Sequence, residues 1–405
     1  MNAVFFAETS ASAVIGGAER VLREQALGLR RRGHQISIVA RAPAHDLRSE
    51  VLVNDVREQR YAVSRRHGSA FVWSSVVRSV QAFDETRASN SPDVVVIHQS
   101  LAGLGPILRR RTRSDGWVYV CLSLAHEEYL SRTSAGRTAR ERAGRTLNGW
   151  FRLLGERMVI RRCAWVIVLS EFMKQRVLRV HGVPKDRLRI IPGAADPCRF
   201  RPPDEPEQVR RSLNLPPNKV VLFTVRNLVP RMGLENLVYA IEKMGEEARD
   251  VLVLIGGEGP LRQTLERLIK DLQMTDRVRL LGFVPEEQLP SYYQAADLIL
   301  VPTLELEGFG LVTVEALACG TPVLGTPVGA LPEVLTRVDP GLVAEGSDAA
   351  SLATAIRRIL RRFRDQPGEQ ERLSAKGRAL VESEYNWDRH CEQLEAVLRE
   401  ARTVH

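Results

Sequence analysis

The fold of this chain is decided by residues 302–316, PTLELEGFGLVTVEA, which join a predicted strand to a predicted helix. The apolar run before them, residues 296–301, has the length of a buried parallel strand, and residues 311–319 have the pattern of a helix. Residues 307–310 are therefore predicted to form a strand-to-helix crossing. In open α/β sheets, ligands bind at such crossings, outside the carboxyl ends of the strands.

Two glycines and two glutamates give this crossing its chemical character. Gly308 and Gly310 let the backbone approach a ligand closely, and the start of the helix offers N–H groups and a positive dipole end to anionic oxygens. Glu307 lies in the loop and Glu315 lies inside the helix, so two carboxylates flank the anion site. The arrangement suits a ligand with phosphate and hydroxyl groups, although either glutamate alone is also explained by solvation or by the helix dipole.

The spacing Glu307-x7-Glu315 resembles the signature of retaining glycosyltransferases of the GT-B fold, and of glycosyltransferase family 4 in particular. Residues 318–323, ACGTPV, and 328–333, VGALPE, match the next two motifs of that family in order and spacing. The resemblance implies an α/β protein with two doubly wound Rossmann-like domains that face each other across a cleft. It also implies a C-terminal helix that crosses back to the first domain.

Length and composition agree with a globular protein of two domains. The chain has 405 residues, of which 44% are hydrophobic and 26% are charged. No apolar run approaches 18 residues and no basic leader precedes the first strand, so we expect no membrane-spanning helix, no signal peptide and a cytoplasmic location. The cysteines are odd in number, scattered and never paired as Cys-x-x-Cys, which predicts reduced thiols and neither a disulfide frame nor a zinc site. They are Cys121, Cys163, Cys198, Cys319 and Cys391.

Positive charge is concentrated in the first half of the chain. Residues 1–200 contain 33 Lys/Arg and 18 Asp/Glu, a net +15, which leaves 25 and 31 of the total 58 and 49, a net −6, for the remainder. A solvated arginine-rich face, an anionic acceptor and an acidic membrane surface all fit this excess, and the last would place the protein peripherally at the inner face of the membrane. Nucleic acid is the weakest candidate, because aromatic residues are not interleaved with the arginines. The arginines concerned are Arg109, Arg110, Arg111, Arg113, Arg132, Arg137, Arg140, Arg142, Arg145 and Arg152.

We expect three segments: residues 1–198 as an acceptor-binding domain, 199–384 as a nucleotide-sugar-binding domain, and 385–405 as the returning helix. In the first domain, Gly16 and Gly17 follow a strand at residues 4–7 and open a helix that stops at Gly33. Their N–H groups can reach a phosphate, although a tight turn would need glycines equally. The resemblance implies that this loop faces the donor diphosphate or the acceptor.

Two histidines stand at the carboxyl ends of predicted strands in the first domain. His98 ends the strand 93–98 and is either an acceptor-binding residue or a hydrogen-bonded core residue. His126 follows the strand 117–122 and matches the histidine that, in the resembled family, binds hydroxyls of the donor sugar and lines the reaction centre.

Residues 137–162 have the pattern of a long basic helix. We expect its apolar stripe to pack on the core, with contact between its rim and a membrane as the alternative. The stripe consists of Leu147, Trp150, Phe151, Leu154, Met158 and Val159. Loops at 42–91 and 131–145 are expected to select the acceptor and carry no recognisable motif.

In the second domain, Arg226 and Arg231 follow the predicted strand 220–225. The resembled family has an arginine and a lysine here that neutralise the donor diphosphate, but Met232 stands where the lysine would be. We therefore expect Arg231 to reach the phosphate. Gly193 likewise replaces an asparagine of the family's Pro-Asn-Gly-x-Asp loop, which leaves the role of that loop open.

Further donor-binding residues come from the resemblance. Gly257 lies in a turn close to the phosphates, and it belongs to no dinucleotide fingerprint because the third glycine is missing. Phe283 and Val284 lie where backbone groups meet the nucleotide base. Glu315 is assigned to the ribose hydroxyls, and Glu307 to hydroxyls of the sugar, with the backbone of Phe309, Gly310 and Leu311 nearby.

These assignments predict a glycosyltransferase that uses a nucleoside diphosphate sugar and a saccharide or lipid-linked acceptor in polysaccharide or glycoconjugate synthesis. Arginines and helix ends would stabilise the departing diphosphate, and no Asp-x-Asp pair ends a strand, so we expect no metal and no cofactor. Retention of configuration is carried over from the family. A nucleotide-sugar epimerase or hydrolase of the same fold and a non-catalytic sugar-nucleotide-binding protein remain alternatives, and the base, sugar and acceptor stay open.

Overall fold

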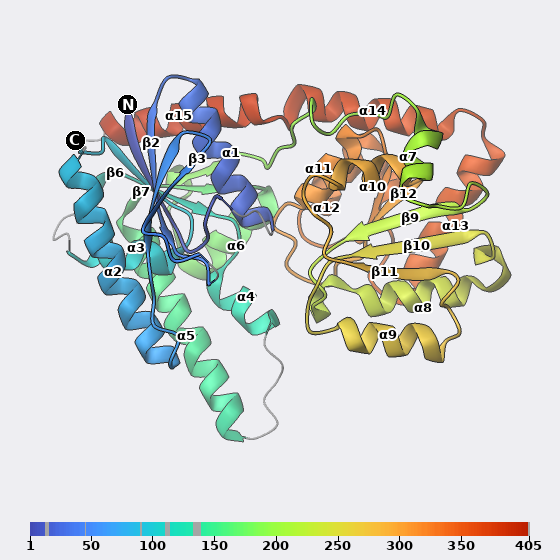
Figure 1. Cartoon of the computed structure of the whole chain (residues 1–405), viewed down its shortest axis with the longest axis horizontal. Helices are drawn as coiled ribbons and strands as arrows, with labels where there is room; N and C mark the ends of the chain where they lie inside the picture. Colours follow the sequence, from blue (N-terminus) through green and yellow to red (C-terminus); the bar gives the residue numbers. More distant parts are fainter. Residues whose placement is uncertain (13–15, 45, 90, 110–113, 133–138, 404–405) are drawn as a thin grey trace. The chain divides into compact units, whose positions relative to one another are not determined.

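The computed structural model describes residues 1–12, 16–44, 46–89, 91–109, 114–132 and 139–403, and the chain forms two compact units. Unit 1 contains Met1–Pro192 and Trp387–His405, and unit 2 contains Gly193–Asn386. Each unit has its own sheet with helices on both faces (Figure 1). The domain limits expected from the sequence, after residues 198 and 384, lie a few residues from these.

The sheet of unit 1 has the order β3-β4-β2-β1-β5-β6-β7-β8 in the described residues. All neighbouring strands are parallel except β3, which is antiparallel to β4. The strands are β1 (Asn2–Ala7), β2 (Gln35–Arg41), β3 (Glu50–Val53), β4 (Val56–Tyr61), β5 (Val94–Ile97), β6 (Ser114–Cys121), β7 (Cys163–Val168) and β8 (Leu188–Ile190).

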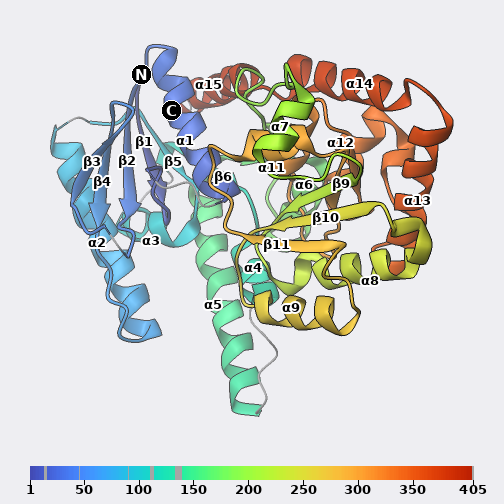
Figure 2. The ribbon, with the colours of Figure 1, turned by 45° about the vertical axis from the view of Figure 1, so that its right-hand side comes forward.

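Alternating side chains of these strands supply two hydrophobic cores. Val4 and Phe6 belong to one core, whereas Ala3 and Phe5 belong to the other, as the period of two in a strand requires. Helices α2, α3 and α5 cover the first face, and α1 and α15 cover the second (Figures 1 and 2). The helices of unit 1 are α1 (Gly17–Arg31), α2 (Gly68–Ser89), α3 (Ser100–Arg109), α4 (Ala125–Arg132), α5 (Ala139–Arg162), α6 (Glu171–His181), the 3₁₀ turn η1 (Lys185–Arg187) and α15 (Trp387–Thr403).

The β3–β4 hairpin was not predicted from the sequence. Asn54 and Asp55 connect its strands with φ angles of 44° and 64°, the left-handed conformation that a two-residue turn of type I′ requires. The sequence of β4, VREQRY, is polar and does not have the pattern of a buried strand. Its Glu58 and Arg60 are nevertheless buried, because they pair with each other inside the unit.

Helix α15 belongs to unit 1 although it comes last in the chain. Gln25 on α1 and His390 on α15 are joined by a hydrogen bond of 2.8 Å between Nε2 atoms. At Gly28 a Cβ atom would lie 2.3 Å from Sγ of Cys391, so the two helices approach closely at a position without a side chain.

Unit 2 has a parallel sheet of order β11-β10-β9-β12-β13. Its strands are β9 (Val220–Val225), β10 (Val251–Gly256), β11 (Val278–Gly282), β12 (Leu298–Val301) and β13 (Val323–Gly325). The predicted strand 220–225 coincides with β9, and the predicted strand 296–301 contains β12. Together the two sheets confirm the expected fold class, an α/β protein with two doubly wound Rossmann-like units.

Helices cover both faces of this sheet, with α8 and α9 on one side and α10 and α11 on the other (Figure 1). The helices are α7 (Pro206–Ser212), α8 (Leu234–Met244), α9 (Arg262–Asp271), α10 (Leu289–Ala295), α11 (Leu311–Ala318), α12 (Leu331–Val338), α13 (Ala349–Asp365) and α14 (Glu369–Glu384). The 3₁₀ turns are η2 (Pro230–Met232), η3 (Gly245–Ala248) and η4 (Pro340–Leu342).

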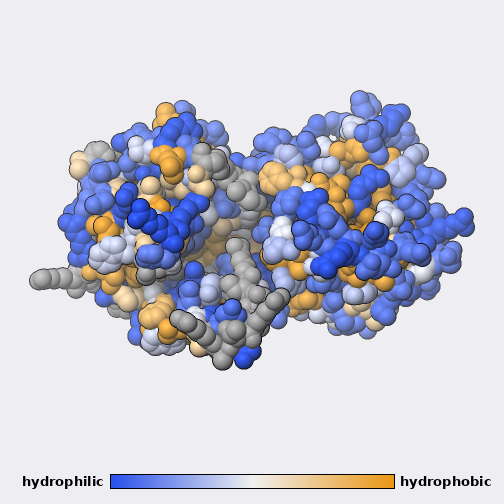
Figure 3. Space-filling view, turned by 60° about the horizontal axis from the view of Figure 1, so that its bottom comes forward, coloured by the Kyte–Doolittle hydropathy of each residue, from blue (hydrophilic) through white to orange (hydrophobic). Residues whose placement is uncertain are grey.

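The surface drawn in Figure 3 is mostly hydrophilic, with hydrophobic residues in small patches. None of the helices in the described part of the chain combines the length and apolar character needed to cross a bilayer.

Candidate active site

The loops after β9 and β12 meet at the point in unit 2 where the strand order reverses. These two strands are neighbours in the sheet, yet their helices return on opposite faces. In doubly wound sheets this switch point opens a crevice for ligands. Arg226 directly follows β9, and Thr303 and Glu307 follow β12.

A buried cluster of Arg226, Thr303 and Glu307 occupies this switch point. Nη2 of Arg226 donates to Oγ1 of Thr303 at 2.7 Å and to Oε2 of Glu307 at 2.5 Å, and Oγ1 of Thr303 donates to the same carboxylate oxygen at 2.9 Å. The side chains of Arg226 and Glu307 are only 7% and 10% exposed. The structure thus brings two predicted site residues together, and it adds Thr303, which sequence reasoning missed although it lies two positions beyond a strand end.

The hydrogen bonds that the Arg226 guanidinium makes to Thr303 and Glu307 all come from its Nη2 atom. No described residue accepts a hydrogen bond from its buried Nε. A buried, charged donor at a switch point can bind an anionic ligand.

The backbone around Glu307 is held in an unusual conformation. Leu306 has φ = 59°, which a branched side chain rarely adopts, and Gly310, the N-cap of α11, has φ = 82°. The carbonyl of Glu307 accepts a hydrogen bond from Ala330 N at 3.0 Å, and a Cβ atom at Gly329 would lie 2.1 Å from that carbonyl oxygen. The segment VGALPE therefore serves at least in part to fix the position of Glu307.

Arg231 lies beside the same loop. Its Nη1 donates to the carbonyl of Leu306 at 3.3 Å, and its own carbonyl accepts from Leu304 N at 2.8 Å. Met232, where the resembled family has a lysine, is only 6% exposed and belongs to the core. The structure therefore brings Arg231, and not residue 232, to the loop that carries Glu307.

Glu315 lies apart from this cluster, in the interior between α10 and α11. It is 1% exposed, and its Oε2 accepts a hydrogen bond of 2.9 Å from the hydroxyl of the buried Tyr293. A role in ligand binding would require this carboxylate to become accessible.

Phe309 and Leu311 pack inside unit 2. A Cβ atom at Gly193 would lie 2.4 Å from Cδ1 of Phe309 and 2.9 Å from Cδ2 of Leu311, and the rings of Phe309 and Tyr385 are 5.7 Å apart. This packing explains why a glycine stands at residue 193. The side chain of Phe309 is buried, so only its backbone is suited to meet a ligand, together with Gly308 and Gly310, whereas Leu311 is half-buried.

Gly257 and the segment after β11 complete the carboxyl edge of the sheet. Gly257 has φ = 128°, and a Cβ atom there would lie 1.9 Å from the carbonyl oxygen of Arg226, so only glycine allows the two loops to touch. Phe283 is 54% exposed, whereas Val284 is buried. Phe283 is thus the accessible side chain of the predicted base-binding pair.

In unit 1 the strand order reverses between β1 and β5, and His98 follows β5 at this switch point. It is 2% exposed, and neither ring nitrogen has a partner among the described residues. Burial, with a smaller effect of the nearby His390, lowers the pKa of His98 to about 3, so the ring is neutral at pH 7.

Glu8, which sequence reasoning missed, follows β1 at the same switch point. Its Oε1 accepts from Leu101 N at 3.1 Å, and its Oε2 lies 3.7 Å from Nη1 of Arg41. Burial raises the pKa of Glu8, although Arg41 opposes this effect. Its position directly after the first strand was the signal that could have identified it.

His126 and the two glycines lie elsewhere along this edge. His126 is near the start of α4, its side chain is 15% exposed, and burial lowers its pKa despite Glu127, whose Oε1 is 3.9 Å away. Gly16 N donates to Oε2 of Glu19 at 3.1 Å, and Gly17 begins α1 and is exposed. Residues 13–15 of the loop before them, like Arg110, Arg111, Arg113 and Arg137, lie outside the described residues.

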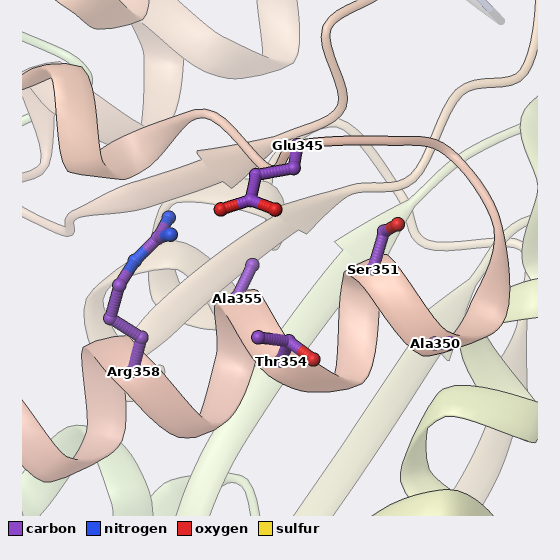
Figure 4. A pocket seen from close by; sticks show the side chains of 6 residues that line it. All are labelled: Glu345, Ala350, Ser351, Thr354, Ala355 and Arg358. Carbon is purple, nitrogen blue, oxygen red and sulfur yellow. The ribbon is translucent and has the colours of Figure 1, made fainter.

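The described residues include no group of three or more His, Cys, Asp or Glu side chains arranged to hold a metal ion. A small surface hollow of about 190 Å³ lies at the start of α13, lined by Glu345, Ala350, Ser351, Thr354, Ala355 and Arg358 (Figure 4). It is smaller than a typical ligand pocket of roughly 300–1,000 Å³ and contains none of the predicted residues.

Comparison with known proteins gives family matches over both units. The family described as Glycosyltransferase Family 4 matches residues 15–199, and the family described as Glycosyl transferases group 1 matches residues 205–380. A GDP-mannose-dependent monoacylated alpha-(1-6)-phosphatidylinositol monomannoside mannosyltransferase of Corynebacterium glutamicum is 30% identical over 262 residues, which are 62% of this chain and 67% of that protein. D-inositol 3-phosphate glycosyltransferase of Mycolicibacterium smegmatis is 29% identical over 384 residues, covering 92% and 83%.

Solved structures resemble the whole chain. Sucrose-phosphate synthase from Thermosynechococcus elongatus has a TM-score of 0.82 at 25% identity, covering 98% of both chains. An Anabaena protein crystallised with UDP and glucose has a TM-score of 0.76 at 17% identity, covering 99% of this chain and 100% of that one, and this likeness concerns the fold alone.

Proposed function

Because the chain belongs to glycosyltransferase family 4, we propose that it transfers a sugar from a nucleoside diphosphate sugar to an acceptor hydroxyl, with retention of the anomeric configuration. The class of enzyme, glycosyltransferase, follows from the family. We propose the donor, the acceptor and the role of each residue.

The observation that carries the proposal is the Arg226–Thr303–Glu307 cluster at the switch point of unit 2. It joins a buried cation with an unused N–H donor to a buried carboxylate. A sugar nucleotide offers the complementary groups, since its diphosphate accepts hydrogen bonds from arginine and its sugar hydroxyls donate them to a carboxylate.

We assign Arg226 and Arg231 to the donor diphosphate, together with the N-terminus of α11. As the bond between the anomeric carbon and the phosphate oxygen breaks, negative charge grows on the departing diphosphate. Groups fixed where this charge develops lower the barrier, and the loss of one such donor typically costs roughly 3–4 kcal/mol. The acceptor oxygen then bonds to the anomeric carbon, and its proton passes to the departing diphosphate oxygen.

We assign Glu307 to hydroxyls of the transferred sugar. In the structure its carboxylate is satisfied by Arg226 and Thr303, so these contacts hold the side chain in place before donor arrives. Gly308 and Gly310 let the backbone beside it approach the ligand. From unit 1, His126 is assigned to the same sugar, on the basis of its family resemblance.

We assign the nucleoside of the donor to residues that follow β10 and β11 and to one residue of α11, at the carboxyl edge of the unit 2 sheet. We propose that Phe283 and the backbone at Val284 meet the base, that Gly257 lies near the phosphates, and that Glu315 holds the ribose hydroxyls. The last role requires the Tyr293–Glu315 contact to open, because Glu315 is buried.

Unit 1 is proposed to bind the acceptor. His98 is neutral, and its ring nitrogens have no partners among the described residues, so it could exchange hydrogen bonds with acceptor hydroxyls once its buried ring becomes accessible. Gly17 would offer its backbone to phosphate, and so would Gly16 if its contact with Glu19 opened. The names of the relatives support GDP-mannose as the first donor to test and an inositol-containing or lipid-linked acceptor. We propose a cytoplasmic reaction that serves polysaccharide or glycoconjugate synthesis.

A thermal-shift screen with GDP-, UDP- and ADP-sugars tests donor binding, because a ligand that binds the folded state raises the melting temperature. The best donor is then used to measure release of nucleoside diphosphate with and without acceptors. We expect turnover that depends on an acceptor and falls at least a hundredfold in Arg226→Met. Release of free sugar without any acceptor would instead indicate a hydrolase, and binding without turnover would indicate a non-catalytic protein.

A further inference from the structure

The first half of α5 is exposed, whereas its second half is buried and carries a carboxylate. Leu147, Trp150 and Phe151 are 54%, 52% and 59% exposed. The expectation that the whole apolar stripe packs on the core is therefore wrong for these three residues, because the described part of unit 1 leaves that face of the helix uncovered. Further along the helix, Val159 of the stripe is fully buried, and so is the acidic Glu156.

The carboxylate of Glu156 contacts polar groups from three other elements of unit 1. Its Oε1 accepts a hydrogen bond of 2.8 Å from the hydroxyl of Tyr119 on β6, and its Oε2 lies 3.2 Å from Nε2 of His181, the last residue of α6. The third group is the backbone N–H of Ala125 in α4, whose nitrogen lies 3.3 Å from Oε1 and 3.2 Å from Oε2. Four elements thus meet at one buried carboxylate.

A carboxylate is a costly group to bury at this place. Among the described residues, its only ion-pair partner is His181, and no arginine or lysine balances it. A buried network of this kind is often no more stable than apolar side chains of the same volume. The carboxylate therefore indicates a task that a leucine or methionine at residue 156 would not perform, which is to accept hydrogen bonds.

That task is performed at the start of α4. A helix begins with N–H groups that have no acceptor inside the helix, and the side chain of the preceding residue often supplies one. The residue before α4 is Leu124, whose apolar side chain has no acceptor atom. Glu156, 31 positions after Ala125, supplies the acceptor for this N–H group. The start of α4 therefore depends on a tertiary contact.

His126 lies between two residues that are both held in place. Ala125 before it is bound by Glu156, and Glu127 after it accepts a hydrogen bond from Arg176 of α6. The ring of His126 is less constrained, since its Nδ1 has no partner among the described residues and its Nε2 lies 3.9 Å from Oε1 of Glu127. The position of the imidazole is thus set mainly by the backbone of α4.

We propose that Glu156 is a positioning residue for His126. By binding the first N–H group of α4, its carboxylate fixes the backbone that presents the imidazole to the transferred sugar. Glu156 is 0% exposed and does not itself touch the sugar. The inference rests on the proposed function, in which His126 contacts that sugar, and it adds a residue for which the family resemblance assigned no role.

Steady-state transfer and amide hydrogen exchange of the full chain test the proposal. In Glu156→Leu the N–H group of Ala125 loses its acceptor, so we expect amide exchange of residues 125–132 to be about tenfold faster and kcat about tenfold lower. The thermal shift caused by the nucleoside diphosphate of the best donor should stay unchanged, because we assign that binding to unit 2.

The conservative variant Glu156→Gln should restore exchange and kcat to within about threefold of the parent. Its amide oxygen can still accept from Tyr119 and Ala125, and its amide nitrogen can donate to Nε2 of His181. A second variant, Ala125→Pro, removes the same hydrogen bond from the donor side and covers the case that Glu156→Leu fails to fold. Proline is well tolerated at the first position of a helix, and we expect kcat to fall about tenfold here too.

A double-mutant cycle separates positioning from general destabilisation. If Glu156 acts through His126, then Glu156→Leu and Ala125→Pro should each change kcat by no more than about twofold in a His126→Ala background. The matched control is Ile160→Val, which alters another fully buried side chain of α5, one that forms no hydrogen bond. Its kcat and the exchange of residues 125–132 should stay within about twofold of the parent.

The outcomes separate this inference from the proposed function. Exchange and kcat like those of the parent in Glu156→Leu would overturn the inference, and so would losses that add fully to those of His126→Ala. Transfer by His126→Ala at the rate of the parent would reject the assignment of His126 and with it the role of Glu156. The absence of acceptor-dependent transfer by the parent would reject the proposed function itself.

Discussion

The ion pair between Arg226 and Glu307 is a contact that only the tertiary structure reveals. Each was predicted as a site residue from its place after a strand, but nothing in the sequence indicates that they pair. In the fold the two charges are buried together, and Thr303 completes their hydrogen bonds. Removing one member would leave the other charge buried without its partner, which is more costly than the net contribution of the pair.

We predict that Glu307→Gln lowers kcat by about 10²–10³-fold, since a neutral amide neither accepts from sugar hydroxyls as strongly nor balances Arg226. The measurement is steady-state transfer with the best donor of the screen. Nucleotide binding and the melting temperature are measured in parallel to separate catalysis from folding.

The control for this variant is Glu305→Gln. Glu305 lies in the same loop but is exposed, so its kcat should stay within about twofold of the parent. A Glu307→Gln enzyme as active as Glu305→Gln would remove Glu307 from the reaction centre.

Two departures from the family pattern also have explanations at this scale. Met232 replaces a lysine at a buried position, where a charged side chain would lack solvent, and Arg231 beside it reaches the Glu307 loop instead. At Gly193, where the resembled family has an asparagine, Phe309 and Leu311 fill the space that a side chain would need.

At the scale of elements, α15 is attached to the end of α1 by an ionic cluster around Glu395. Its Oε2 accepts from Nε of Arg32 at 2.5 Å, its Oε1 lies 3.0 Å from Nε2 of His34, and Arg399 also donates to it. Burial opposes ionisation of Glu395, but these hydrogen bonds outweigh it and lower the pKa to about 2. Ionised Glu395 therefore stabilises the docking of α15.

The pKa of Glu395 is lower in the folded state than its ordinary value of 4.5, so its stabilisation is complete above about pH 4.5 and is lost as the pH falls toward 2. We predict that Glu395→Gln lowers the free energy of unfolding at pH 7 by about 2 kcal/mol. The difference from the parent should shrink between pH 4.5 and the acid limit of folding. Thermal and urea unfolding followed at several pH values measure it.

Glu400→Gln is the comparison on the same helix. Glu400 is 50% exposed and lies 3.5 Å from Arg189, a surface pair that contributes little. If the two variants were equally stable at pH 7, the cluster around Glu395 would not be what fastens α15.

At the scale of the whole molecule, the two units share one arrangement. Each has a sheet of mainly parallel strands whose order reverses at one point, and polar residues lie at the carboxyl ends of the strands there. Unit 1 presents Glu8 and His98 there, and unit 2 presents Arg226 and Glu307. In unit 2 the positive groups are arginines and a helix end, which are suited to stabilising a diphosphate without a metal ion.

We therefore predict that turnover with the best donor is unchanged in excess EDTA and is not raised by added Mg²⁺ or Mn²⁺. The assay is transfer by the full chain after dialysis against the chelator. Loss of activity in EDTA that Mg²⁺ or Mn²⁺ restores, with the melting temperature unchanged, would show that a metal takes part in the reaction.

The sequence by itself determined the class of fold, because buried parallel strands such as 220–225 and 298–301 are continuous apolar runs whose pattern is local. It also determined the family, through the order and spacing of Glu307, Glu315 and the motifs that follow. These signals can be recognised in the sequence because strand length, turn glycines and motif spacing do not depend on residues far away in the chain.

Tertiary structure alone decided which side chains are buried together and which remain exposed. The pairing of Arg226 with Glu307, the enclosure of Glu315 by Tyr293 and the polar strand β4 all depend on residues far apart in the chain. The exposure of Leu147, Trp150 and Phe151 on α5 depends on which face of that helix its neighbours cover. Burial is a property of neighbours in space, and an apolar stripe looks the same in sequence whether or not a neighbour covers it.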